Sequence, residues 1–280
     1  MDEHTQSLPS LSELLEESWR RYKILFWPLM AVGGLGGIIA LFAALVPFSI
    51  ALYLWFGAGY SSPWLWGFSG AASLFAALSA ATWAQIALME TALNPSGFTH
   101  AVAVYRATWK KTTSFSWVCF LSLLAAIGGV YLFIFPGIFL AFALSFAPFI
   151  CLAENIKGVK ALERSLSYFN GHWFGIVGRL IFISVSAWLL SAIPILGVLS
   201  GILTLPFALI FTTVLYSQLR LKNEPTPFPH ARTLLGVSLV GLLIPALLAF
   251  RLASRWPQIF QGIKNEAGPF LSSHLGGGFQ

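Results

Sequence analysis

The clearest pattern in the chain is the length of its apolar stretches. The 66 residues from Ile24 to Met89 contain no Asp, Glu, Lys or Arg, and neither do the 42 residues from Thr112 to Ala153. A helix crosses the hydrocarbon core of a membrane with about 20 apolar residues, so each stretch can hold two crossings. Neither stretch shows the period of two that is typical of barrel strands. Helices are the remaining possibility, because a segment that spans a membrane must satisfy the hydrogen bonds of its own backbone groups.

Turn residues divide the chain into predicted spans. We expect an all-α, polytopic transmembrane bundle whose six helices form three hairpins, at about 24–56, 64–91, 116–135, 136–153, 174–193 and 196–216. The first span is longer than a bilayer needs, which predicts a tilt or a bend at Pro47. The helix-break motif Pro136–Gly137 is predicted to separate the third and fourth spans, and Pro194 is predicted to end the fifth.

A further apolar segment follows the six spans. Residues 233–250 are 18 uncharged positions with Pro245 among them, which predicts a seventh helix. The segment either crosses the membrane, re-enters from one side or lies in the interface, and we favour the crossing. The predicted organisation is a cytoplasmic amphipathic segment at 1–23 and a six-helix membrane domain at 24–222. A linker with the seventh transmembrane or re-entrant helix follows at 223–251, and a flexible tail at 252–280.

The distribution of charge predicts the orientation. Only 9% of the residues are charged, against about 25% in soluble domains. Twelve of the 16 Lys and Arg residues lie before the first span or in every second connection, and the connections near Gly59, Pro136 and Pro194 have none. The positive-inside rule therefore predicts a cytoplasmic amino terminus, although a seventh crossing would put Arg251 and Arg255 outside. The net charge of +6 thus reflects topology, and no nucleic-acid partner is expected.

Three short segments with related patterns precede the odd-numbered spans. Each has a hydroxyl residue beside basic residues, eight or nine positions before a Trp: Ser18 before Trp27, Thr108 before Trp117 and Ser165 before Trp173. We interpret them as three repeats of an interfacial amphipathic helix followed by a hairpin. The alternative is that any cytoplasmic end of a span collects basic and aromatic residues. In either case the basic residues would attract anionic lipid headgroups, by about 1 kcal/mol each near the surface.

Catalytic and metal-binding patterns are weak. Gly67-Phe68-Ser69-Gly70 is similar to the nucleophile motif of rhomboid intramembrane proteases. The segment that begins at His274 is similar to the histidine helix of the same proteases. A serine nucleophile needs a base within hydrogen-bonding distance, whereas His274 lies in a polar tail outside any predicted span. The five histidines are scattered, and no ligand spacing for a metal or phosphate loop for a cofactor is found. We therefore expect no enzyme, metal or cofactor.

A few charges lie close to the predicted spans. Arg179 is the only basic residue within the first six spans, and Glu90 and Glu154 close two spans on the predicted cytoplasmic side. Charges are costly in a bilayer and often functional. Arg179 could pair with one of the two carboxylates, snorkel to the interface, or line a path for a substrate or proton. Repeated proline breaks are also found in transporters, so a small-solute or lipid transporter or channel near Arg179 is the second hypothesis.

An ordered series of motifs appears in the middle of the chain. It consists of Phe135-Pro136-Gly137-Ile138, Phe146-Ala147-Pro148, Glu154, the run from Ala161 to Ser165 that includes Arg164, and Trp173. The series resembles the bacterial membrane-domain family found fused to glycerophosphodiester phosphodiesterases and its stand-alone relatives. The resemblance implies a six-helix membrane domain whose biochemical role is mostly unassigned. It does not imply phosphodiesterase activity, which in that family belongs to a separate soluble barrel.

These observations predict a non-enzymatic, multi-pass protein of a bacterial plasma (inner) membrane. The expected partners are membrane lipids with anionic headgroups, and a protein partner or a second copy of the chain. Membrane homeostasis, anchoring or scaffolding would be the role. A membrane lipid enzyme or an intramembrane protease remains a distant alternative. The residues expected to matter most are Arg179, Glu154, Glu90, Arg164 and Ser165.

Overall fold

The structure is a computed structural model that describes residues 9–59, 62–95, 97, 100–192, 197–222, 230–251 and 253–255. Several predictions therefore fall outside the described residues. These are the turn at Pro194, the first part of the linker at 223–229, and almost all of the tail from 256 onward, including His274.

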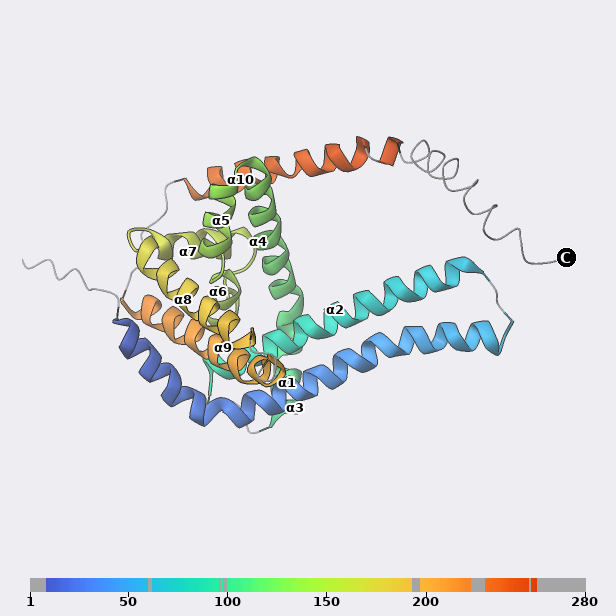
Figure 1. Cartoon of the computed structure of the whole chain (residues 1–280), viewed down its shortest axis with the longest axis horizontal. Coiled ribbons are helices and arrows are strands. Elements are labelled where there is room, and N and C mark those ends of the chain that lie inside the picture. The colour runs from blue at the N-terminus through green and yellow to red at the C-terminus, as the bar shows by residue number, and fades with distance from the viewer. Residues whose placement is uncertain are drawn as a thin grey trace, which may run out of the picture. The chain divides into compact units, whose positions relative to one another are not determined.

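The described residues are helical throughout, with no strand, as the sequence predicts (Figure 1). The helices, in order, are α1 (Leu11–Phe56), α2 (Pro63–Leu93), α3 (Ala101–Thr108), the short 3-10 helix η1 (Trp109–Lys111), α4 (Thr112–Leu132), α5 (Ile134–Ala143), α6 (Ala147–Ala153), α7 (Val159–Phe169), α8 (Trp173–Ser191), α9 (Gly197–Lys222) and α10 (Ala231–Gly241).

Six helical stretches of the described chain are long and apolar enough to cross a membrane, which is the pattern of a multi-pass membrane protein. They are Leu11–Phe56, Trp64–Leu93, Ala101–Leu132, Ile134–Ala153, Trp173–Ser191 and Ala231–Arg255. Five of them overlap the first five predicted spans, and the last contains the predicted seventh helix. The predicted sixth span lies within α9, a helix of 26 residues that is not one of the six. The crossing of the last stretch remains a prediction.

The break between the third and fourth spans lies earlier than predicted. α4 ends at Leu132 and α5 begins at Ile134, so the chain turns at Phe133. Pro136 falls in the first turn of α5, where its missing N–H group needs no partner within the helix. A side chain on Gly137 would collide with the backbone of Val130. The motif therefore allows α5 to turn back closely along α4, and the break itself comes three residues before it.

The predicted fourth span is also interrupted. α5 ends at Ala143 and α6 begins at Ala147, with turn residues between them. Pro148 lies at the start of α6, as is common in the first turn of a helix. The sequence motif Phe146-Ala147-Pro148 thus marks the beginning of a short helix of seven residues and does not lie inside a continuous span.

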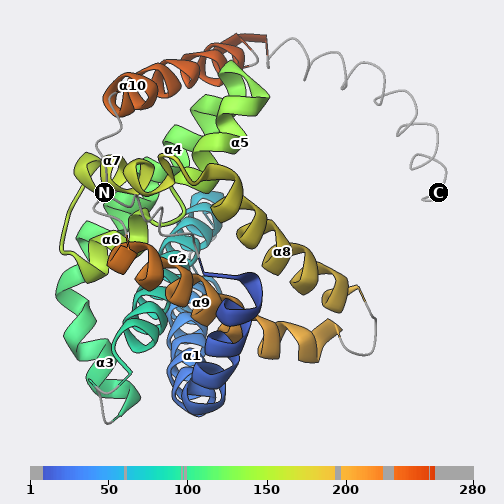
Figure 2. The ribbon, with the colours of Figure 1, turned by 90° about the vertical axis from the view of Figure 1, so that its left-hand side faces the viewer.

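The chain forms two compact units. The first comprises Met1–Ser122 and Phe142–Ala231, and the second Leu123–Ala141 and Arg232–Gln280. In the first unit, α1 and α2 run side by side as a hairpin, and α9 packs against α1 (Figures 1 and 2). Val32, Ala87, Val104 and Tyr105 form a buried cluster where α3 meets this hairpin.

The second unit is held by close contacts between backbones. A side chain on Gly128 of α4 would collide with the carbonyl group of Ser238 in α10, and one on Gly241 would collide with the carbonyl group of Gly128. Small residues of this kind allow membrane helices to approach closely. The start of the C-terminal helical stretch is therefore packed against α4, which is consistent with a segment that belongs to the membrane part of the chain.

The long helix α1 combines the predicted amphipathic segment and the first span. Ser10 caps it, because its hydroxyl accepts from the backbone N–H of Glu13 while the Glu13 carboxylate accepts from the N–H of Ser10. Figure 1 shows α1 changing direction in its first half. Pro28 and Pro47 both lie inside this helix, and a proline inside a helix removes a backbone hydrogen bond. The expected tilt, or bend at Pro47, stays a prediction.

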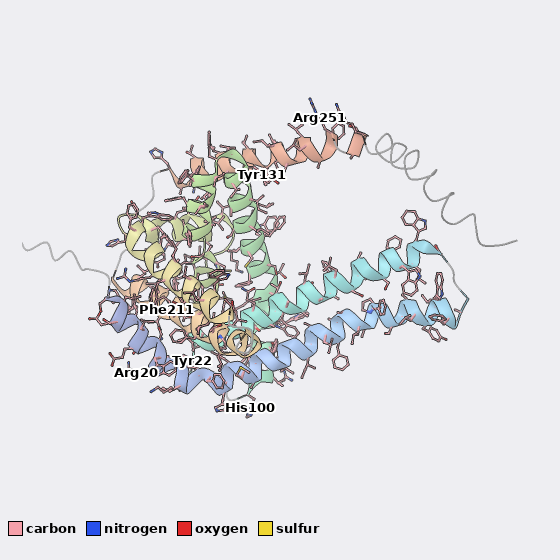
Figure 3. All side chains as sticks on the ribbon, in the orientation of Figure 1. Arg20, Tyr22, His100, Tyr131, Phe211 and Arg251 are labelled. Atoms are coloured by element: carbon pink, nitrogen blue, oxygen red, sulfur yellow. The ribbon has the colours of Figure 1, made fainter. Side chains whose placement is uncertain are left out.

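The amphipathic segments fold as helices, and part of each apolar face packs against the protein. Ser18, Thr108 and Ser165 are each fully buried, at 0% exposure. On α7, Leu162 and Leu166 are also buried. Figure 3 shows Tyr22 on the first part of α1, and its hydroxyl donates to the carbonyl of Leu203 in α9 at 3.1 Å. Other apolar side chains of these segments, such as Trp19 and Val159, are exposed, and their contact with lipid stays a prediction.

Candidate functional site

The candidate site is a network of polar groups around Glu154, which follows α6. Its Oε1 atom accepts two phenol hydrogen bonds, from Tyr168 at 2.8 Å and from Tyr216 at 2.7 Å. Its Oε2 atom accepts from Nε of Arg164 at 3.2 Å. The Glu154 side chain is only 9% exposed. Three donors therefore surround a nearly buried carboxylate, which compensates for the loss of its hydration.

Local sequence explains how the chain reaches this arrangement. Between α6 and α7, Asn155 and Gly158 have φ values of 56° and 61°, in the left-handed region that allows a sharp reversal. After the reversal, Arg164 and Tyr168 stand four residues apart on α7 and therefore face the same side. The Arg164 guanidinium also lies over the Tyr168 ring, 5.5 Å from its centre.

The network fixes the protonation state of Tyr168. Burial raises the pKa of Tyr168 to about 12, and its hydrogen bond to the Glu154 carboxylate acts in the same direction. A phenol with this pKa remains protonated at neutral pH, so Tyr168 acts as a donor. The phenol would have to lose its proton to serve as a base, and the neighbouring carboxylate opposes that loss.

A second carboxylate has a related environment. Glu90, near the end of α2, accepts from Nζ of Lys111 at 2.9 Å and from the side-chain amide of Asn94 at 3.0 Å. Its side chain is 8% exposed, whereas that of Lys111 is 42% exposed. In both places a carboxylate at the end of a span binds a cation from the next amphipathic segment. Glu90 and Glu154, with Lys111 and Arg164, define what we call the polar end of the first unit.

Arg179 does not join the two carboxylates. Its guanidinium donates to the backbone carbonyls of Gly175 at 2.6 Å and Pro9 at 2.5 Å, and its Nε atom is buried without a hydrogen-bond partner. Among the described residues it has no ion pair with Glu90 or Glu154, which corrects one of the pairings considered from the sequence. Arg179 instead ties α8 to the residue that precedes the Ser10 cap of α1.

Ser165 completes the interrupted helix between α5 and α6. Its hydroxyl donates to the carbonyl oxygen of Ala143 at 2.5 Å. Ala143 ends α5, so its carbonyl has lost the partner that a continued helix would provide. This role is structural. Pro136 and Gly137 lie in the second unit, where they shape the turn between α4 and α5.

Two tyrosines of the network were not anticipated from the sequence. Tyr168 could have been found, because it stands one helical turn after Arg164 on a segment already recognised as amphipathic. Tyr216 gives no comparable signal, since 62 residues separate it from Glu154. A third buried tyrosine, Tyr105, donates to the carbonyl of Val32 at 3.0 Å and attaches α3 to α1.

The other groups that could carry chemistry have structural surroundings. The Ser69 hydroxyl donates to the carbonyl of Pro47 at 3.3 Å, so it joins α2 to α1. Cys119 and Cys151 are free thiols. In the part of the chain that the structure describes, no three His, Cys, Asp or Glu side chains are grouped so that they could hold a metal ion.

Comparisons with known proteins give no independent assignment. No protein-family model, no curated protein and no solved structure matches this chain. The resemblance to the membrane-domain family therefore stays a prediction from the motifs around Pro136, Pro148, Glu154 and Arg164.

Proposed function

We propose that this chain is a non-enzymatic, multi-pass protein of a bacterial inner membrane, with its amino terminus in the cytoplasm. It gathers anionic lipid or a membrane partner at its cytoplasmic face and serves membrane homeostasis, anchoring or scaffolding. In this proposal the chain belongs with the stand-alone relatives of the membrane-domain family that its motifs resemble.

The observation that carries the proposal is the pairing at the polar end. Glu154 accepts from three side chains and Glu90 from two, and both carboxylates are nearly buried. A general acid or base needs access to a substrate, and these carboxylates are occupied by their own neighbours. A stable, fully bonded network of this kind is suited to holding helices in place. The exposed basic residues around it are suited to contact with anionic groups.

The transport alternative rests mainly on Arg179, and its surroundings favour a structural role. Both of its hydrogen bonds go to backbone carbonyls, and one of them anchors the start of α1. We expect proteoliposomes containing Arg179→Ala to show the same background flux of small solutes as wild-type proteoliposomes. A solute flux that the wild-type protein supports and this variant abolishes would contradict the proposed function.

Lipid analysis tests the proposal itself. Wild-type protein would be reconstituted in vesicles with equal amounts of phosphatidylglycerol and phosphatidylcholine, then extracted gently, and the lipids that remain bound would be quantified. We expect phosphatidylglycerol to be enriched severalfold over phosphatidylcholine, with no hydrolysed lipid. An unenriched lipid shell without any bound protein partner, or the release of lipid hydrolysis products, would refute the proposal.

A further inference from the structure

One group of basic side chains surrounds the Glu154 network and is not used by it. Lys157 follows Glu154 in the loop before α7, and Arg220 lies one helical turn after Tyr216 on α9. Both side chains are exposed. Arg220 and Tyr216 stand four residues apart on α9 and therefore lie on the same side of that helix. Together with Arg164, Lys157 and Arg220 form a basic rim around the network.

Arg164 is held in an orientation that suits a phosphate. Its Nε edge faces Glu154, and its planar group lies over the Tyr168 ring. The guanidinium has five N–H donors in a fixed fork, so the carboxylate cannot use them all. The side chain is 37% exposed. An arginine fixed by a carboxylate and an aromatic ring loses little further freedom when its remaining donors bind a phosphate oxygen pair.

The charge around the rim is favourable for an anion. The segment from Glu154 to Arg164, taken together with Arg220 at the end of α9, contains four basic residues (Lys157, Lys160, Arg164 and Arg220) and two acidic ones (Glu154 and Glu163). Two positive charges are therefore in excess. Glu154 is already bound by three donors, so its charge is largely compensated.

Apolar side chains beside the rim favour a lipid over a free anion. Leu221 follows Arg220 and is 80% exposed. Val159 at the start of α7 is 48% exposed. A phospholipid could place its phosphate on the basic rim and an acyl chain against such side chains, and a soluble phosphate would gain nothing from them.

We propose that Lys157, Arg164 and Arg220 form a binding site for the phosphate of an anionic phospholipid. This inference rests on the proposed function, because it assumes that this end of the bundle faces an anionic leaflet. It deepens that function by assigning the contact to one place on the surface, whereas the other basic segments contribute only general attraction.

The chain offers a matched control for this assignment. Arg106 and Lys110 are exposed basic residues of the second amphipathic segment, on the same predicted side of the membrane. Lys157→Ala/Arg220→Ala and Arg106→Ala/Lys110→Ala each remove two positive charges. Neither pair makes a hydrogen bond in the Glu154 network, so both double variants are expected to fold. Arg164→Lys is the third variant. It keeps the positive charge and removes the planar set of N–H donors of the guanidinium, so it tests whether the geometry of these donors matters.

Binding would be measured on detergent-solubilised protein by native mass spectrometry, with phosphatidylglycerol and with phosphatidylcholine of the same acyl chains. We expect wild-type protein to retain phosphatidylglycerol preferentially. The Lys157→Ala/Arg220→Ala variant should lose about tenfold in affinity, as expected for two charge-assisted contacts, and Arg164→Lys about fivefold. The Arg106→Ala/Lys110→Ala variant should lose less than about threefold.

The outcomes separate the site from the general function. If wild-type protein retains phosphatidylglycerol and both double variants lose affinity equally, the rim is no specific site, although the proposed function survives. If wild-type protein shows no preference for phosphatidylglycerol, the inference fails, and the proposed function fails with it when no protein partner is bound either. Competition by inorganic phosphate or glycerol phosphate as strong as that by the lipid would assign the site to a soluble anion and overturn the inference.

Discussion

The two carboxylates of the polar end occupy related places in the sequence and have different surroundings. Glu154 is enclosed by an arginine and two phenols that come from α7 and α9. Glu90 is bound by a lysine and by the amide of Asn94, its own neighbour one helical turn away. The Glu154 network therefore joins the end of α6 to the next helix, α7, and to α9 much later in the chain, whereas Glu90 attaches α2 to the short helix η1.

This difference indicates which of the two sites carries more of the stability. The two phenol donors to Glu154 are themselves held by packing, since Tyr168 and Tyr216 are each 1% exposed. Lys111 is 42% exposed and would be well hydrated without Glu90. Removing one partner of a buried ion pair is costly because the other charge is left without compensation, and this cost falls as exposure rises.

The largest expected effect is therefore that of Glu154→Ala. The variant leaves Arg164 without its carboxylate and two buried phenols without their acceptor, and we expect a loss of about 2–3 kcal/mol in the free energy of unfolding. Glu90→Ala is the matched comparison, with an expected loss of about 1 kcal/mol. Unfolding of both variants in detergent would be followed by circular dichroism. A loss in the free energy of unfolding for Glu90→Ala that equals or exceeds the loss for Glu154→Ala would contradict this ranking of the two sites.

Removal of a single phenol should have an intermediate effect. Tyr216→Phe keeps the ring and its packing against Phe146 and Phe149, and deletes only the hydrogen bond to Glu154. A hydrogen bond to a charged group contributes about 1.5 kcal/mol or somewhat more, so a loss of about that size is expected. Tyr105→Phe, which deletes a bond to the neutral carbonyl of Val32, should cost less. A Tyr216→Phe variant that is as stable as the wild-type protein would show that Glu154 is satisfied without this donor.

The smallest expected effect is a dependence on alkaline pH. The pKa of Tyr168 is raised to about 12 in the folded protein, from an ordinary value of 10.0. Its contribution to stability is then complete below about pH 10 and is lost as the pH rises from 10 towards 12, because the unfolded chain releases the proton first. Glu154, Arg164 and Tyr216 face this phenol. Tyr168→Phe should lack this part of the pH dependence.

Thermal unfolding in detergent between pH 9 and pH 11.5 would measure this dependence in wild-type protein and Tyr168→Phe. Other groups titrate in the same range, so the quantity of interest is the difference between the two curves. We expect the difference in stability between the proteins to narrow as the pH rises. A constant difference would mean that the Tyr168 phenol is not held protonated by its neighbours.

Much of the fold follows from the sequence for simple physical reasons. Uncharged runs predict helices, and the helical stretches from Trp64 to Leu93 and from Trp173 to Ser191 agree with the expected spans. The turn at Phe133 was misplaced because Pro136 and Gly137 are strong signals, although a proline in the first turn of a helix does not end it. The sequence also does not say which apolar positions of α3 and α7 are covered by protein, since an amphipathic pattern does not tell lipid from protein.

The candidate site was predictable only where its residues are close in sequence. Glu154, Arg164 and Ser165 lie in one short stretch of related motifs, and the structure gives each of them a defined partner. The partner of Arg179 could not be found in the same way, because Pro9 is 170 residues away and contributes only a backbone carbonyl. Long-range contacts between helices depend on packing, and a single sequence does not record them.

The measurement that tests the central claim most directly is the accessibility of single cysteines. Cys119 and Cys151 would be replaced by Ala, and Gly59→Cys, Lys110→Cys and Lys157→Cys introduced one at a time. In intact bacterial cells with a permeable outer membrane, a membrane-impermeant maleimide should label only Gly59→Cys, since we propose that the polar end faces the cytoplasm. After the inner membrane is opened, all three should be labelled. Labelling of Lys110→Cys or Lys157→Cys in intact cells would contradict the account.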